Sequence, residues 1–151
     1  MLVTLAHTGS DHLGKDGCDP IVRDYLKRCT GWAHCNTEAF RSEKALLEWL
    51  RRQRGRTEAV AMFLDGRGRQ MSSEEIASWL GVRRDEGSQH VIFAVGPADG
   101  WSDEALAEAG RLGGLLSLGK MTLAHSLARL VMAEQIYRAV TILTGHPYHR
   151  A

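Results

Sequence analysis

The sequence predicts a single α/β domain with a mostly parallel β-sheet flanked by helices. Two continuous apolar runs of strand length, Ala59–Leu64 and His90–Val95, indicate strands buried on both faces, as in parallel sheets. Segments with helical periodicity alternate with the strands, which is the pattern of βα units. A chain of 151 residues with 44% hydrophobic and 25% charged residues is the size of one such domain, residues 1–151.

In the first half of the chain, capping residues and breaks in periodicity set the boundaries of the expected elements. Asp19 is the expected N-cap of the first helix, with Pro20 in its first position, and Thr37 is the expected cap of the second. The expected elements are a strand Leu2–Ala6, a Gly-rich acidic loop Thr8–Asp19, a helix Pro20–Arg28, a weak strand Trp32–Cys35 and a helix from Glu38 to about Arg54.

The second half repeats a strand-then-helix pattern. The expected elements are a strand Ala59–Leu64, a helix from Ser72 to about Val82, a strand His90–Val95, a helix from Ser102, a strand Leu115–Leu118 and a long helix Ala124–Thr144. Ligands of parallel sheets bind at the carboxyl ends of the strands. The loops in that position are Asp65–Gly68, Gly96–Gly100 and Leu118–Thr122, and none has the G-x-G-x-x-G pattern of an ordinary dinucleotide site.

Several classes of protein are disfavoured by composition. No apolar segment reaches the roughly 20 residues of a membrane span, and the N-terminus lacks the basic lead of a signal peptide, so we expect a cytoplasmic protein without a membrane partner. Cys18, Cys29 and Cys35 are odd in number and include no CxxC pair. They predict neither a disulfide framework nor a zinc site, and we expect no metal.

The net charge of +1 does not by itself identify a nucleic-acid-binding protein. Arginines do cluster, however, at Arg51, Arg52, Arg54 and Arg56, at Arg67 and Arg69, and at Arg83 and Arg84. Such clusters suit a phosphate-binding surface, and they equally suit solvated helix ends near the negative pole of the helix dipole.

Glu134 is unusual in the last helix because it falls within the apolar face. That face is defined by Leu127, Leu130, Val131, Tyr137 and Thr141. One interpretation is an i, i+4 pair with Arg138, worth ~0.3 kcal/mol on an exposed helix. The other is a partly buried carboxylate, in a cleft or a dimer interface, that orients a base or accepts a proton.

The tail after Gly145, His146-Pro147-Tyr148-His149-Arg150, is short and rich in functional groups. Its imidazoles, phenol and guanidinium offer proton transfer, base stacking and phosphate contact. A chain end is also commonly frayed and solvated. The residues alone leave both interpretations open.

Three segments together resemble the C-terminal signature of a known family: Lys120–His125, Leu127–Ala139 and His146–His149. In order and spacing they are similar to the RlmH family of SPOUT enzymes, which methylate N3 of a pseudouridine in large-subunit ribosomal RNA. The similarity extends more loosely over Leu64–Gly66 and Gly96–Gly100. It implies a trefoil-knotted α/β fold, a homodimer, S-adenosylmethionine as cofactor, and ribosomal RNA in the large subunit or assembled ribosome as partner.

The resemblance also implies site residues. On the substrate side, His149 is the implied base and Glu134 its orienter or alternate, Arg138 would hold a phosphate or the developing imidate charge, and Tyr148 would stack on the target base. The residues implied at the cofactor are Leu64, Gly96, Pro97, Leu118, Gly119, Lys120, Met121, Thr122, Leu123 and, close to the loop, His125.

Two departures from the family pattern keep alternatives open. Pro97 stands where the family commonly has a second glycine, which removes a backbone N–H and fixes φ. Ala124-His125-Ser126 replaces a usual Pro-His-Pro. The first alternative is therefore a divergent SPOUT-fold protein that binds RNA or a nucleotide without catalysis, and the second is an α/β dimer whose His-rich tail binds metal.

Overall fold

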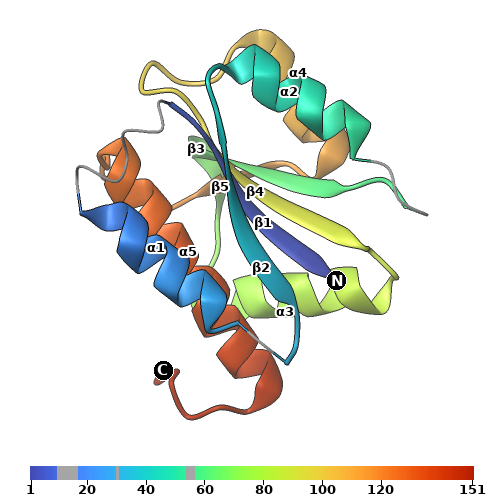
Figure 1. The fold of residues 1–151 in the computed structure, drawn as a ribbon, viewed down its shortest axis with the longest axis vertical. Coiled ribbons are helices and arrows are strands. Elements are labelled where there is room, and N and C mark those ends of the chain that lie inside the picture. Colours follow the sequence, from blue (N-terminus) through green and yellow to red (C-terminus); the bar gives the residue numbers. More distant parts are fainter. Residues whose placement is uncertain (10–16, 30, 54–56) are drawn as a thin grey trace.

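A computed structural model describes residues 1–9, 17–29, 31–53 and 57–151 of the chain. At its centre is a five-stranded sheet in the order β2-β1-β4-β3-β5, with every neighbouring pair parallel. All the strands therefore end at the same edge of the sheet (Figure 1). The strands are β1 (Leu2–Thr8), β2 (His34–Phe40), β3 (Val60–Gln70), β4 (His90–Val95) and β5 (Leu115–Ser117).

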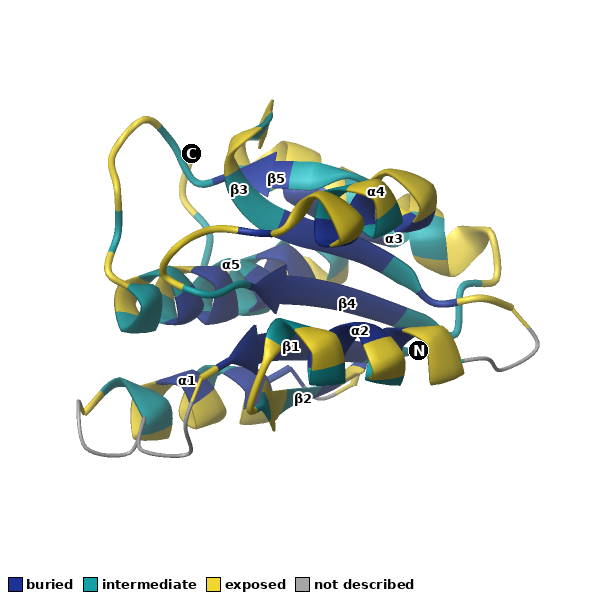
Figure 2. Ribbon diagram, turned by 90° about the horizontal axis from the view of Figure 1, so that it is seen from above, coloured by how far each residue is buried: buried dark blue, intermediate teal, exposed yellow. Residues whose placement is uncertain are grey.

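Helices cover both faces of the sheet and leave its middle buried (Figures 1 and 2). The helices are α1 (Cys18–Lys27), α3 (Ser73–Asp85) and α5 (His125–Thr144) on one face, and α2 (Glu43–Arg52) and α4 (Asp103–Leu112) on the other. A hydrophobic core lies on each face of the sheet, and alternate residues of β4 point into them. Phe93 packs on the side of α1, α3 and α5, and Ile92 on the side of α2 and α4. The expected parallel sheet flanked by helices is confirmed.

The expected cap of the first helix is wrong. Helix α1 begins at Cys18, and its N-cap is Gly17 in the left-handed conformation, without a side-chain cap. Asp19 instead lies in the first turn, where it accepts hydrogen bonds from Arg23 at 2.8 Å and from Arg129 of α5 at 3.2 Å. The Asp19 carboxylate, expected to cap the helix, therefore binds Arg129, which is distant in the sequence.

The expected helix from Glu38 is also wrong at its start, because residues through Phe40 belong to β2, which pairs with β1. The Thr37 hydroxyl donates to the carbonyl of Leu5 at 2.8 Å and caps no helix. Helix α2 starts at Glu43, where Ser42 accepts from the Ala45 amide. Arg54, Arg56 and residues 10–16 of the expected Gly-rich loop lie outside the described residues.

Strand β3 runs past its expected end at Leu64 and continues to Gln70. Its pairing with β5 shifts register between Leu64 and Arg69. A Cβ at Gly68 would lie 2.5 Å from the backbone of Leu115, so this crossing of strands requires glycine. The remaining elements match the expected boundaries within a few residues, and the structure shows Ser72 and Ser102 as the N-caps of α3 and α4.

No helix within the described residues combines the length and apolarity needed to cross a bilayer.

Gly113, which follows α4, provides a test of how closely the helix layer packs on the sheet. A Cβ there would lie 2.4 Å from the carbonyl oxygen of Ala61. We expect Gly113→Ala to lower the free energy of unfolding by about 1–3 kcal/mol in urea denaturation, because backbone must move. Gly110→Ala, at an exposed helical position with open space, should raise it by up to about 1 kcal/mol. Equal effects of the two changes would contradict the close contact.

Candidate functional site

The middle of β3 at Leu64–Gly66, the carboxyl ends of β4 and β5 and the start of α5 surround a cavity of about 560 Å³. This volume is in the range of small-molecule sites, and the position is the usual ligand edge of a parallel sheet. The cavity is lined by Leu64, Asp65, Gly66, Val95, Gly96, Pro97, Ala98, Gly100, Trp101, Leu116, Leu118, Gly119, Lys120, Met121, Thr122, Leu123, Ala124, His125 and Ala128.

All ten residues expected at a cofactor lie on the wall of this one cavity. They come from strand β3 (Leu64), the loop after β4 (Gly96 and Pro97), the loop after β5 (Leu118–Leu123) and the start of α5 (His125), which the parallel sheet brings together. Trp101 and Ala128 also line the cavity, and sequence reasoning missed them. Trp101 carried a usable signal, because it directly follows a loop at the carboxyl end of a predicted strand.

Trp101 forms a fixed part of the cavity wall. Its indole N–H donates to the carbonyl of Leu64 at 2.9 Å, its ring centroid lies 4.7 Å from that of Phe63, and only 8% of the residue is exposed. A Cβ at Gly96 would lie 2.5 Å from the indole ring. Strand β3 and the loop after β4 are thus joined through the Trp101 side chain, which leaves room only for glycine at position 96.

The loop between β5 and α5 forms the opposite side of the cavity. Gly119 adopts φ +119°, which L side chains rarely adopt, and Ser117 hydrogen-bonds both its N–H and its carbonyl at 3.1 Å. Met121 is 81% exposed at the rim. Pro97 also lines the cavity, and its carbonyl accepts the Gly100 amide at 2.9 Å, which closes the loop after β4 without needing an N–H at position 97.

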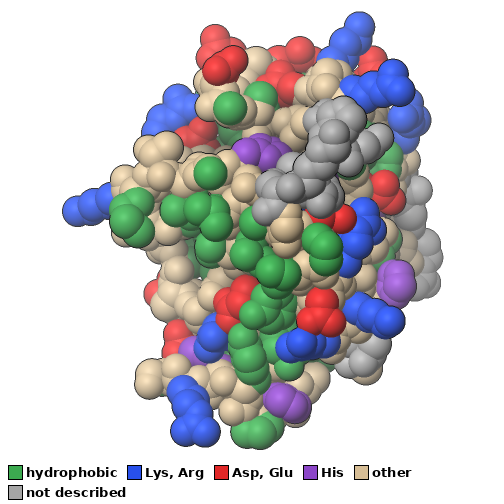
Figure 3. Space-filling view, turned by 60° about the vertical axis from the view of Figure 1, so that its left-hand side comes forward, with side chains coloured by type: hydrophobic (Ala, Val, Ile, Leu, Met, Phe, Trp, Pro, Cys, Tyr) green, Lys and Arg blue, Asp and Glu red, His purple; other side chains and the backbone are tan. Residues whose placement is uncertain are grey.

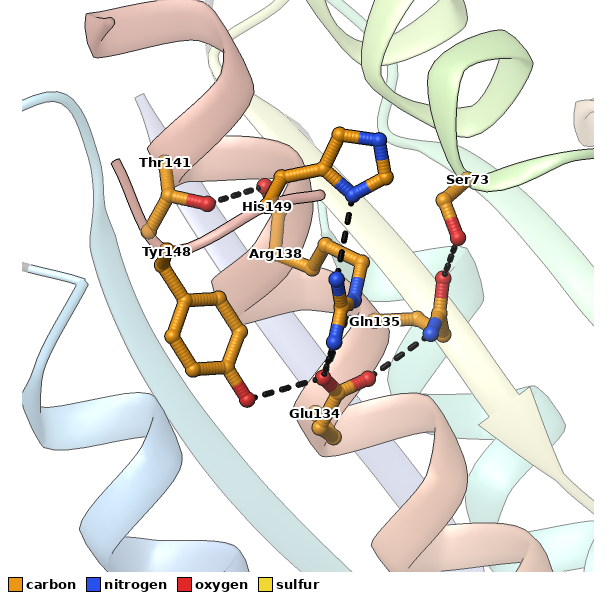
Figure 4. A network of polar contacts seen from close by, with 7 residues as sticks. All are labelled: Ser73, Glu134, Gln135, Arg138, Thr141, Tyr148 and His149. Atoms are coloured by element: carbon orange, nitrogen blue, oxygen red, sulfur yellow. Dashed lines mark hydrogen bonds and ion pairs between the residues drawn. The ribbon is translucent and has the colours of Figure 1, made fainter. Parts of the chain in front are cut away.

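A second group of predicted residues forms a polar network between α5 and the C-terminal tail (Figure 4). Glu134 Oε1 accepts from Arg138 Nη2 at 2.7 Å and Nε at 3.0 Å, and from the Tyr148 hydroxyl at 2.9 Å. The Arg138 guanidinium lies 4.8 Å from the centre of the Tyr148 ring. Glu134 therefore joins helix and tail, so it is both the i, i+4 pair and the partly buried carboxylate that its position suggested.

His149 is held through both ring nitrogens. Arg138 Nη1 lies 3.0 Å from Nδ1, and because a guanidinium only donates, Nδ1 is the acceptor. The proton is then on Nε2, which donates to Glu74 Oε1 at 2.8 Å. This contact lowers the pKa of Glu74. The structure thus fixes the tautomer and adds a residue of α3 that sequence reasoning did not identify.

Two further contacts support the network. Gln135 donates to Glu134 Oε2 at 2.7 Å and accepts from the Ser73 hydroxyl at 2.6 Å, so α3 holds the carboxylate indirectly (Figure 4). Burial and the hydrogen bond to Glu134 raise the pKa of Tyr148 to about 12. Tyr148 is thus a hydrogen-bond donor at neutral pH, and the tail is an ordered part of the structure.

None of the network residues lines the cavity. His125, on the cavity wall, and Glu134 are nine residues apart on α5, which corresponds to about 13 Å along a helix. A single chain therefore presents two separate sites, one for a small molecule and one rich in groups for proton transfer and anion contact.

Among the clustered arginines that the structure describes, Arg83 is partly buried and the others are exposed. Several pair with carboxylates: Arg51 with Glu104, Arg67 with Asp65, and Arg83 with Glu86. Within the described ranges, no group of three or more His, Cys, Asp or Glu side chains could hold a metal ion, and the three cysteines form no disulfide.

Comparison with known sequences places the site in context. A family profile described as "Predicted SPOUT methyltransferase" matches residues 1–149. Proteins named ribosomal RNA large subunit methyltransferase H are similar to this chain. One from Koribacter versatilis is 51% identical over 129 residues, 85% of this chain and 86% of the relative. One from Rhizobium rhizogenes is 44% identical and covers 93% of this chain and 84% of the relative. A third, from Rhizobium meliloti, is 46% identical over 76% of this chain, which spans 64% of that relative.

Solved structures share the fold at low sequence identity. The SpoU methyltransferase AviRb from Streptomyces viridochromogenes, in complex with AdoMet, has a TM-score of 0.51 and 14% identity over 96% of this chain and 61% of its own. A ribosomal RNA small subunit methyltransferase E from Neisseria gonorrhoeae, bound to S-adenosyl methionine, has a TM-score of 0.51 and 17% identity over 95% of this chain and 66% of its own. These likenesses confirm the expected α/β fold.

The hydrogen bond between Tyr148 and Glu134 can be tested by titrating the phenol. In Glu134→Gln the negative charge that disfavours the phenolate is lost while burial remains, so the pKa of Tyr148 should fall from about 12 toward its usual value. The measurement is tyrosinate absorbance against pH, with Tyr148→Phe to identify the signal among the three tyrosines. An unchanged titration in Glu134→Gln would contradict the contact.

Proposed function

This chain belongs to the SPOUT methyltransferase family, and we propose that it transfers the methyl group of S-adenosylmethionine to N3 of a pseudouridine in large-subunit ribosomal RNA. That it is an S-adenosylmethionine-dependent rRNA methyltransferase follows from the profile match over residues 1–149 and from relatives that carry this function in their name. Transfer to N3 of a pseudouridine is the proposal itself, and the observation that supports it is the pair of sites. The cavity contains every residue expected at the cofactor, and the network contains every residue expected at the substrate.

The cavity suits the proposed cofactor in size and in chemistry. Leu64 and Leu118 supply apolar surface, and the loops around Gly96 and Gly119 expose backbone groups that can hold an adenine by its edge. When bound, S-adenosylmethionine supplies an electrophilic methyl group on a positively charged sulfur. Trp101, fixed to Leu64, keeps the wall rigid, so the cavity is formed before any ligand enters.

On the substrate side, the ring N3–H of pseudouridine must lose its proton before it can attack the methyl group effectively. We propose His149 as the base, acting through Nδ1, because Glu74 holds the proton on Nε2. Arg138 now occupies Nδ1, so it must turn to an RNA phosphate or to the developing imidate when substrate binds. Glu134 holds Arg138 and Tyr148 in place, and Tyr148 would stack on the base. A positioned base contributes about 100- to 10,000-fold to such a step.

The two sites can form one active centre if the enzyme is a homodimer. An outward stripe of α5 carries Leu127 and Val131, 46% and 37% exposed, and continues at helical spacing to Glu134 and Arg138. Met121 adds exposed apolar surface at the cavity rim. Figure 3 shows hydrophobic side chains gathered on the face that carries α1 and α5. Two-fold pairing over this stripe would bring the network of one copy toward the cavity of its partner.

Three further parts of the proposal come from the family. We propose that the chain has the trefoil knot of SPOUT enzymes, that it works in the cytoplasm, and that its RNA is presented within the large subunit or the assembled ribosome. The near-neutral net charge of +1 supports the last point, because a weakly charged protomer gains little affinity from free RNA alone.

The activity can be tested by transfer of a tritiated methyl group from S-adenosylmethionine to ribosomes that lack this modification, followed by mapping of the label. We expect label on a pseudouridine, and a loss of about 100-fold or more in rate for His149→Ala with cofactor affinity unchanged. Label on another nucleotide would overturn the substrate. Cofactor binding without any methyl transfer would favour the non-catalytic RNA-binding alternative. Full activity of the His149→Ala variant would exclude His149 as the base.

The composite site can be tested by mixing two inactive variants. Gly96→Ala disturbs Trp101 in the cavity, and His149→Ala removes the base. An equal mixture of chains that exchange freely should regain roughly a quarter of wild-type activity, because half the dimers are mixed and each mixed dimer has one intact site. Either variant alone is the control. A mixture as inactive as its components would show that each chain works by itself.

A further inference from the structure

Arg129, in the second turn of α5, is a fully buried guanidinium with unused donors. Its relative exposure is 0%, and its one described ion pair joins Nη2 to Asp19 at 3.2 Å. Within the part of the chain that the structure describes, its Nε and Nη1 atoms are buried without a hydrogen-bond partner. Buried donors are nearly always paired, because leaving them unpaired costs their full desolvation. The site is therefore short of an acceptor.

The neighbours of Arg129 do not supply that acceptor. His7, at the end of β1, is 2% exposed, and burial, with further effects from Arg129 and His125, lowers its pKa to about 4. His7 is thus neutral at physiological pH, and its Nδ1 is itself buried without a partner. Asp19 is shared with Arg23, an exposed side chain that binds its other oxygen at 2.8 Å.

This cluster adjoins the cofactor cavity. Ala128, next to Arg129, and His125, one helical turn before it, both line the cavity. The rings of His125 and His7 are 5.9 Å apart, so His7 lies behind the same wall. Because β1 is parallel to β3 and β4, its end lies at the same ligand edge of the sheet. Arg129 itself does not line the cavity, so a ligand group reaches its donors only when side chains of the intervening wall, His125 among them, move aside.

We propose that Arg129, supported by Asp19 and His7, is a subsite for a carboxylate, the one on the amino-acid end of S-adenosylmethionine. This inference rests on the proposed function. A carboxylate supplies strong acceptors for Nε and Nη1, and a guanidinium is the side chain best suited to bind it. An RNA phosphate is a poorer occupant, because the cluster lies behind the wall of the cofactor cavity and apart from the network of Glu134, Arg138 and the tail where the substrate would bind. Asp19 keeps the subsite near neutral, which suits a zwitterionic amino-acid group.

The inference can be tested by comparing two ligands on the intact protein by calorimetry. The ligands are S-adenosylmethionine and its decarboxylated analogue, which lacks only the carboxylate. A hydrogen-bonded carboxylate on a charged partner corresponds to about a 10- to 100-fold preference for S-adenosylmethionine in wild-type protein. Equal affinities would overturn the subsite while leaving the cofactor assignment intact. Binding of neither ligand would overturn the proposed function together with this inference.

Variants then identify the residue responsible. Arg129→Gln should lose the preference by weakening S-adenosylmethionine binding alone, and Arg23→Gln, which removes the exposed partner of Asp19, should keep it. A folded Arg129→Gln protein that retains the full preference would contradict the assignment. Circular dichroism and thermal unfolding report whether the variant folds. If it does not, the comparison of the two ligands on wild-type protein still decides for or against the subsite.

Discussion

The 20-residue helix α5 is the rigid element that holds the two functional regions of this chain apart. His125 on the cavity wall and Glu134 in the network lie about 13 Å apart along this helix, because the tail folds back so that Tyr148 reaches Glu134. Packing against both α1 and α3 keeps the helix in place on the sheet. The proposed homodimer accounts for this separation, because a second copy packed over the exposed stripe at Leu127 and Val131 would bring its own network toward the cavity.

At the cavity, the constraint is steric. Trp101 fills the space beside Gly96 and donates to the carbonyl of Leu64, so strand β3 and the loop after β4 form one rigid wall. A site that is formed in advance binds without the cost of ordering loops. The same arrangement explains how Pro97 is accommodated, since the loop closes through the Pro97 carbonyl and the Gly100 amide and makes no use of an N–H at the proline.

Much of the fold could be predicted from local pattern, and the errors have physical causes. β4 was predicted at its observed boundaries, because it is apolar on both faces and lies in the middle of the sheet. The edge strand β2 was misread, because its exposed and buried residues are mixed and Thr37 resembles a cap. Asp19 also has the composition of a cap, yet its carboxylate serves Arg129 of α5, a partner 110 residues away that no local pattern contains.

Some residues of the candidate site could likewise be predicted from the sequence, and others could not. Residues contiguous in the sequence or spaced along one helix, such as Leu118–Leu123 and Glu134 with Arg138, could be identified by motif or by their misfit with an apolar face. Glu74 could not, because its role arises only where α3 meets the C-terminal tail. Glu74 changes the chemistry most, since it decides which nitrogen of His149 can accept a proton. A histidine found by sequence is a candidate base only in general, and the partner on α3 gives it a defined tautomer and direction.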